Sequence, residues 1–152
     1  MTRRSALVVA ALGLTVVAGC GAGHAGSSST TKDGTTLPAC LATVSPSPVP
    51  TDDTFPVGWA FPPGTVVTST ETVPGGGLAV TAQVGLDFDM VLTFMQHELE
   101  DAGFVATKGE AEDDDAEAMW SGRGYTGTWA IRGSDECPGT TVLQVAAARQ
   151  PG

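Results

Sequence analysis

The feature that most constrains the fold is a period of two in the segment 78–84, where Leu, Val, Ala and Val alternate with Ala, Thr and Gln. Such alternation places one side of a β-strand against a core and the other side toward water. The preceding segment 65–73 is rich in β-branched residues and is joined to it by Pro74-Gly75-Gly76-Gly77. Together the two segments predict a β-hairpin.

A helix is predicted directly after this hairpin. The carboxylate of Asp87 can accept hydrogen bonds from the free amides of a first helical turn, and apolar residues then recur at helical spacing. Gly103 can supply the left-handed conformation that commonly ends a helix. Because the rest of the circumference is polar, we expect the helix to lie on a sheet with one side in water. The apolar face consists of Val91, Leu92, Met95, Leu99 and Ala102.

A second hairpin is predicted in the C-terminal half, with Gly124-Tyr125-Thr126-Gly127 as its turn. This turn pairs Gly122 with Trp129, so that the indole covers the bare glycine backbone. It also pairs Trp120 with Ile131, which puts both indoles on the same, buried side. The expected strands are 118–123 and 128–133.

Two single strands complete the expected sheet. The first, 104–108, leaves the helix, and the second, 140–147, directs Leu143 and Val145 inward. The order of strand, strand, helix and further strands predicts an α+β fold. We expect a two-layer sandwich in which a single helix packs on one antiparallel sheet of about five to six strands.

The chain is strongly acidic, with a formal net charge of −10, and its carboxylates are densest in the segment 110–117. We expect this run to be an exposed loop, because so many charges cannot be buried. A nucleic-acid partner is disfavoured, since its phosphates would be repelled. Carboxylates at alternate positions could bind Ca²⁺, although the run lacks the glycine and the distant glutamate of an EF-hand. A solvated loop and weak calcium binding remain the two interpretations.

The first 20 residues are organised differently. Arg3 and Arg4 precede an uncharged stretch, residues 6–19, and small residues lead up to Cys20. This is the anatomy of a secretory signal. As a helix, the 14 residues of the uncharged stretch would span only ~21 Å, short of the ~30 Å of bilayer hydrocarbon. We therefore expect cleavage and not a permanent transmembrane helix.

Val17-Ala18-Gly19-Cys20 resembles the lipobox of bacterial lipoproteins, and the resemblance covers only these first 20 residues. It implies that Cys20 is diacylglyceryl-modified, becomes the new N-terminus and holds the protein at the outer face of a membrane. Two acyl chains, at about 0.8 kcal/mol per buried CH₂, make a stable anchor. The alternative is an ordinary signal peptide whose cysteine merely lies near the cleavage site. The paired arginines also slightly resemble a twin-arginine export signal, but Ala6 stands where that signal usually has an aromatic, so we favour the general secretory route.

Lipidation of Cys20 would leave two of the three cysteines, Cys40 and Cys137. An even remainder in an oxidising compartment predicts a disulfide between them. Two separate thiols, or a thiol that pairs with another chain, are the alternatives. Removal of the two leader arginines leaves five basic residues against 17 acidic ones, so the mature chain carries a net charge of −12.

Four segments are expected along the chain. The segment 52–63 contains Phe55, Trp59 and Phe61 and should pack across one end of the core. Trp59, Phe61 and Tyr125 could otherwise form a sugar or peptide platform, because aromatic rings offer large contact areas. The four segments are a signal peptide (1–19), a lipidated N-terminus with a flexible tether (20–36), a Cys- and Pro-rich strap (37–54) and a small α+β domain (55–150).

We find no complete catalytic motif in the sequence. His97-Glu98 begins like a zinc-protease helix, but Asp101 stands where a second histidine is required. The Gly-x-Ser-x-Gly motif of many hydrolases is absent, and we expect neither a cofactor nor a metal site. The sequence favours a non-enzymatic envelope lipoprotein that binds a protein or another envelope component. An envelope hydrolase using carboxylates and a weak calcium-dependent module are the alternatives.

Overall fold

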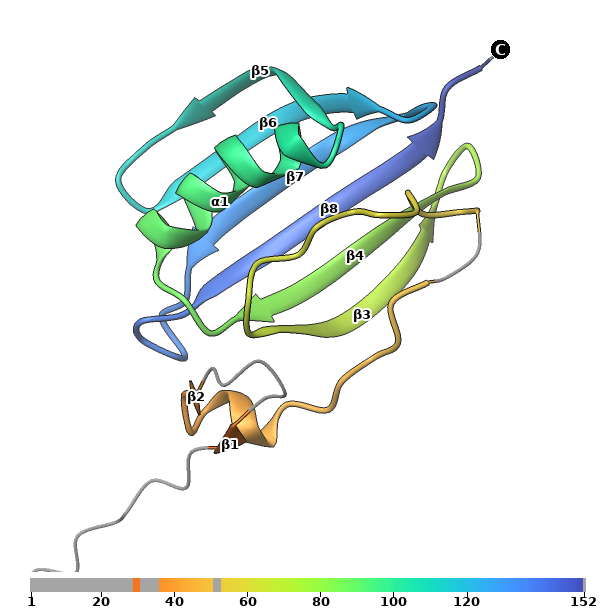
Figure 1. Ribbon diagram of the computed structural model, residues 1–152. Coiled ribbons are helices and arrows are strands. Elements are labelled where there is room, and N and C mark those ends of the chain that lie inside the picture. Colours follow the sequence, from red (N-terminus) through yellow and green to blue (C-terminus); the bar gives the residue numbers. More distant parts are fainter. Residues whose placement is uncertain (1–28, 31–35, 51–52, 152) are drawn as a thin grey trace, which may run out of the picture.

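The computed structural model describes residues 29–30, 36–50 and 53–151. Its main body is a six-stranded antiparallel sheet with one α-helix, α1 (Phe88–Asp101), across one face (Figure 1). This is the predicted two-layer α+β sandwich. The strands are β3 (Thr65–Val73), β4 (Gly77–Val84), β5 (Val105–Ala111), β6 (Asp115–Gly122), β7 (Tyr125–Gly133) and β8 (Thr141–Arg149), and they lie in the spatial order β3-β4-β8-β7-β6-β5.

The first hairpin is formed as the alternating pattern predicted. β3 and β4 pair from Thr65 opposite Val84 to Val73 opposite Gly77. Gly75 and Gly76 both have positive φ, which only glycine adopts at little cost. The apolar positions of β4 are buried, apart from the half-buried Leu78. The last strand, β8, likewise buries Leu143 and Val145.

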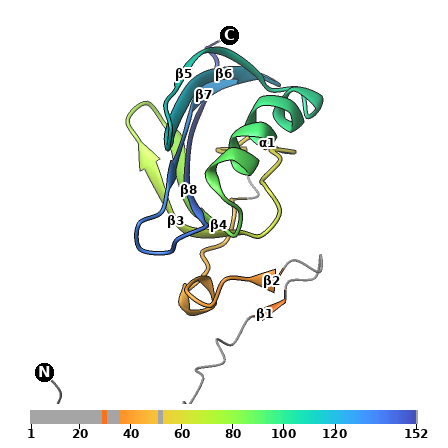
Figure 2. The same ribbon diagram turned by 90° about the vertical axis from the view of Figure 1, so that its left-hand side faces the viewer.

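Helix α1 begins and ends where its capping residues predicted. The Met90 amide donates to Oδ1 of Asp87 at 3.0 Å, and Gly103 has a φ of 86°. Val91, Met95 and Leu99 are buried against the sheet, while Leu92 and Ala102 are half-buried. The helix lies on the concave side of the curved sheet (Figure 2) and carries the chain from β4 across to β5 at the opposite edge.

The second hairpin has a different register from the one we expected. Its turn consists of two residues, Arg123 and Gly124, with φ values of 50° and 80°. Two left-handed residues fit the right-handed twist of the flanking strands, so the short turn replaces the expected four-residue one. Trp120 therefore lies opposite Gly127, and Trp129 lies opposite Ala118. Both indoles remain on the buried face, because the register differs by an even number of residues.

The acidic run is a hairpin and not a loop, which corrects our expectation. β5 continues to Ala111, the turn is 112–114, and β6 begins at Asp115. The Glu112 amide donates to the carbonyl of Asp115 at 2.8 Å. The run is exposed as expected except for Ala116, which is 1% exposed. Ala116 starts a period of two that continues through Ala118 and Trp120 on the helix side of β6. This alternation explains why the segment forms a strand and not a loop.

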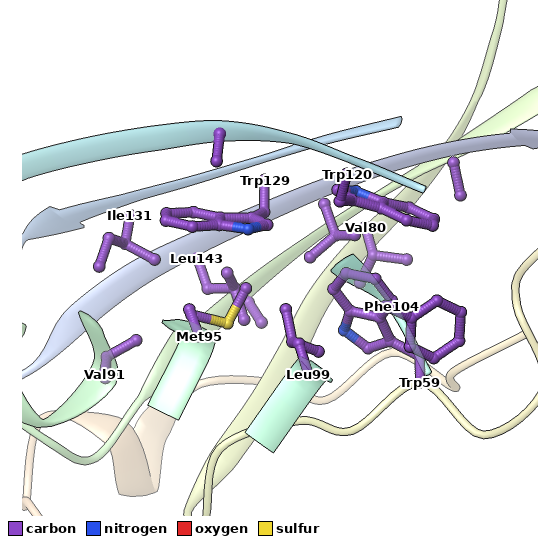
Figure 3. Packing of buried hydrophobic residues seen from close by; sticks show 14 of the residues in the cluster. Trp59, Val80, Val91, Met95, Leu99, Phe104, Trp120, Trp129, Ile131 and Leu143 are labelled. Carbon is purple, nitrogen blue, oxygen red and sulfur yellow. The ribbon is translucent and has the colours of Figure 1, made fainter. Parts of the chain in front are cut away.

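The core is a layer of aromatic and aliphatic side chains between helix and sheet (Figure 3). At one end, Trp59 lies over the sheet with its ring centroid 4.6 Å from that of Trp120 and 5.1 Å from that of Phe104. Phe55 is also buried there. The segment 53–63 thus packs across one end of the core, as its aromatic and proline content predicted.

Polar contacts hold this aromatic segment in place. The hydroxyl of Tyr125 donates to the carbonyl of Asp53 at 2.8 Å, and Arg149 forms an ion pair with the Asp53 carboxylate at the same distance. From the turn between β6 and β7, Nη1 of Arg123 donates to the carbonyl of Val57 at 3.3 Å. Turn residue Arg123 and strand-end residue Arg149 therefore both fasten the segment to the sheet.

The N-terminal part of the described chain packs on the main body through Leu37, Leu41 and Cys40. Short strands β1 (Ser29–Thr30) and β2 (Thr36–Leu37) pair within the region expected to be a flexible tether. The rest of that region, with His24, lies outside the described residues. A 3-10 turn, η1 (Leu41–Thr43), follows. Within the described residues, no helix has the length and apolar character to cross a membrane.

The close contact between Trp120 and Gly127 gives a test of the register. A Cβ on Gly127 would collide with the carbonyl of Ala146 and the ring of Trp120, whereas the nearest atom to a Cβ on Gly133, in the same strand, is 3.8 Å away. We expect Gly127→Ala to lower the free energy of unfolding by about 1–3 kcal/mol or more, and Gly133→Ala to change it by less than about 1 kcal/mol. Urea unfolding of both variants measures the difference. Equal losses would contradict the register.

Candidate functional site

The structure joins Cys40 to Cys137 by a disulfide, with their Cα atoms 5.9 Å apart. The bond ties the strap to the loop between β7 and β8, over a sequence separation of 97 residues. Leu37 and Leu41 pack around Cys137 and form a second, smaller apolar cluster. Cys20, the expected lipidation site, lies outside the described residues.

The candidate aromatic platform belongs to the core. Trp59 is 8% and Tyr125 6% exposed, and Phe61 is half-buried with its ring stacked on that of Phe55. The hydroxyl of Tyr125 already donates to Asp53. Tyr125 therefore offers little open surface to a ligand, whereas Trp59 and Phe61 line a hollow of about 240 Å³.

The described residues gather no set of three or more His, Cys, Asp and Glu side chains that could hold a metal ion. His97 is exposed on α1. The strand carboxylates Glu110, Asp115 and Glu117 alternate with alanines, so they share the face that points away from α1, but they form no group that could hold a metal ion. The calcium interpretation thus gains no support from the geometry of the acidic hairpin.

A hollow of about 260 Å³ lies on the face of the β5–β6–β7 region that points away from the helix. Lys108 and Met119 pair across it, as do Glu110 and Glu117. Thr128 and Ala130 of β7 close its far side. Both glutamates are exposed, and like charges directly opposite one another on a sheet are unfavourable. The pair is therefore a place where a cationic group would be stabilised.

A larger groove of about 360 Å³ lies on the other face, between α1 and β5. Leu92 and Gln96 of α1 form one wall. The floor is the cross-strand row Gly109, Ala118 and Trp129, in which the two outer strands contribute almost no side-chain bulk. The groove is open because these positions are small, not because a residue is missing from the layer.

The three core tryptophans share an unusual polar feature. The Nε1 atoms of Trp59, Trp120 and Trp129 are buried, and none donates a hydrogen bond within the described part of the chain. An unsatisfied buried donor typically costs about 1–3 kcal/mol. Trp129, which is 3% exposed, is the member of this set that lines the groove beside β5.

Charge is unevenly distributed around the groove. The segment 110–117 carries six carboxylates, whereas the nearby cations are Lys108 and Arg132. Arg132 approaches Asp115 to 3.8 Å, but both side chains are more than half exposed. This ion pair therefore contributes little to the stability of the fold. The β5–β6 hairpin is thus a negatively charged edge beside the groove.

The hydrolase interpretation would require two convergent acids beside a cleft, and Glu110 and Glu117 meet part of this requirement. The buried polar residues of the described chain are, however, only Thr140 and Thr141. No carboxylate in that part is enclosed, so none has the apolar surroundings that commonly prepare a general acid.

Sequence reasoning missed the groove because it assigned the acidic run to a loop. The signal was nevertheless present: in 115–120, acidic or flexible residues alternate with Ala116, Ala118 and Trp120. The dipeptide Arg123-Gly124 was a second signal, since a two-residue turn would have set the correct register. Gly109 could not have been linked to Trp129 without that register.

The chain was compared with known protein families, curated proteins and solved structures. No protein-family model matches the chain, and searches of curated proteins and of solved structures found no match.

The disulfide can be tested by peptide mapping and by stability. Mass spectrometry of non-reduced peptides should find Cys40 joined to Cys137, and the double variant C40S/C137S should lose about 2–5 kcal/mol of unfolding free energy because its unfolded chain is no longer cross-linked. A reductant should destabilise the native protein but leave the double variant unchanged. Free thiols at both positions would refute the bond.

Proposed function

We propose that this chain is a lipoprotein anchored at the extracytoplasmic face of the cell membrane by lipid on Cys20, and that its domain is a non-enzymatic binding module. The lipobox-like motif Val17-Ala18-Gly19-Cys20, preceded by a short apolar stretch, supports the anchor. The partner of such a module is another component of the cell envelope, most simply a protein.

The single observation that carries the binding role is the edge of the sheet at β5. All seven residues of this strand are exposed, and a groove and a hollow lie on its two faces. Strand edges and grooves of this kind are established recognition surfaces for peptide segments. The rest of the sheet's helix-side face is filled by α1 and the aromatic segment.

The anchor is tested by fractionating cells that express the native chain or Cys20→Ala. The native chain should stay with membranes after a high-salt wash, and its N-terminal peptide should carry acyl chains on Cys20. The variant should be released, because no acyl chain then holds the protein to the bilayer. His24→Ala is the matched control and should remain on the membrane. An N-terminus upstream of Cys20 on the native protein, or no fatty acid there, would refute the anchor.

The binding role is tested by placing a photoreactive residue on three surfaces of the anchored protein. The positions are Thr107 on β5, Thr72 on β3 and His97 on α1, all exposed. A binding module should give a crosslinked adduct of one defined mass from at least one position, and saturation by excess unlabelled protein should abolish it. The absence of any saturable adduct at all three positions would overturn the binding role.

A further inference from the structure

We propose that the β5 edge binds an extended segment of another protein by strand addition, and that this segment alternates apolar residues with lysine or arginine. The proposal rests on the binding role above and names its site and the chemistry of the partner. Three independent features of the described residues lead to it: an uncovered strand edge, a slot beside it and an excess of carboxylates around it.

The two edges of the sheet are treated differently by the chain. At the β3 edge, the Ser47 amide donates to the carbonyl of Val67 at 2.7 Å, and the Ser47 hydroxyl donates to the carbonyl of Thr68 at 3.0 Å. The proline-rich strap thus already covers that edge at Val67 and Thr68. At β5, no backbone hydrogen bond from outside the β5–β6 pair reaches residues 105–111 among those described. An unpaired strand edge presents free amides and carbonyls to an incoming strand.

The groove gives the incoming strand a specific side-chain position. Paired residues in neighbouring strands point to the same face, so a residue opposite Gly109 would project over Gly109 and Ala118 toward the ring of Trp129. Leu92 of α1 forms the wall of this slot. A Cβ on Gly109 would come within 2.6 Å of the Glu117 carbonyl, so the protein itself leaves this position unfilled. The slot favours a long apolar side chain.

The opposite face determines which charges are favoured in the incoming strand. Of the two residues that flank the apolar one in the added strand, one would lie opposite Glu110 and the other opposite Lys108, on the same face. Lysine or arginine opposite Glu110, and toward the 112–114 turn beyond it, would relieve the repulsion between Glu110 and Glu117, whereas a basic residue opposite Lys108 would be unfavourable. Toward this turn, the expected pattern is therefore alternation of apolar and basic residues, which a strand displays on two faces.

A second copy of this chain is not the occupant that the charges favour. Pairing two copies would bring together two surfaces that each carry six carboxylates in residues 110–117. β5 also contains Lys108 at its centre and a register irregularity between Ala106 and Lys108. The irregularity limits an added strand of any kind to the regular part of β5, residues 108–111.

The test uses the anchored full-length protein extracted in detergent and a synthetic peptide of about eight residues that alternates lysine and valine, a length matched to a typical strand. Two further peptides serve as comparisons: one has N-methyl groups on alternate amides and the same charge, and the other has glutamate in place of lysine. We expect the first peptide to bind at least about tenfold more tightly than either comparison, because only it has both the free amides and the positive charge. Hydrogen exchange should slow at the β5 amides alone.

Variants then separate this site from general attraction to an acidic protein. E110Q/E117Q should weaken binding on the order of threefold to tenfold and reduce its dependence on salt. E98Q/E100Q, which removes the same number of exposed carboxylates from α1, should leave the affinity unchanged. Circular dichroism checks that both variants remain folded.

Each other outcome overturns the proposal. Equal binding of the methylated peptide, or equal losses in the two double variants, would mean charge attraction without strand addition. No binding of the lysine–valine peptide would refute the site, as would a concentration-dependent dimer with slowed exchange at β5, which would make a second copy the occupant. In these cases a saturable crosslink from Thr72 or His97 would still leave the binding role standing, whereas failure of all three crosslinks would remove that role itself.

Discussion

The contact between Trp120 and Gly127 is the interaction on which the rest of the domain depends. A glycine at this position lets the indole lie close to the neighbouring strand, because a Cβ there would collide with both the Trp120 ring and the carbonyl of Ala146. The same indole contacts Trp59 and Phe104, so it connects the sheet, the exit of the helix and the aromatic segment 53–63. β6, β7 and β8 all meet near this point. The large side chain of Trp120 and the missing side chain of Gly127 together favour one register of these strands.

Much of the fold could be predicted from the sequence because its strongest signals are local. The alternation in 78–84, the Asp87 cap and the Gly103 stop each depend on residues that are close in sequence, and each is confirmed. The second hairpin was wrong in register because Gly124-Tyr125-Thr126-Gly127 resembles a turn as well as Arg123-Gly124 does. What decides between them is the twist of the strands and the contact of Trp120 with Gly127, and neither is visible before the strands are paired.

The candidate site was harder to predict from the sequence than the fold. A run of charged residues is usually solvated, and its side chains are indeed exposed, but the backbone beneath them is a paired strand. Only the small residues Ala116 and Ala118 face the helix there, so the acidic character of their neighbours hid the alternation. The groove arises because bulk on this row is concentrated at Trp129, two strands from the edge. Such a distribution becomes apparent only when the strands are laid side by side.

The position of the disulfide determines which end of the sheet is joined to the N-terminal part of the chain. In an antiparallel sheet the β7–β8 loop, which contains Cys137, and the 112–114 turn lie at the same end, and the Gly133 amide donates to the carbonyl of Asp114 at 2.9 Å there. A lipid at Cys20 would therefore pull on the domain from its acidic pole. The Arg123-Gly124 turn and the end of β8 lie at the opposite end of the sheet, away from this attachment. With the proposed lipid anchor, the disulfide would make the 112–114 end of the sheet, and not the Arg123-Gly124 end, the point of attachment.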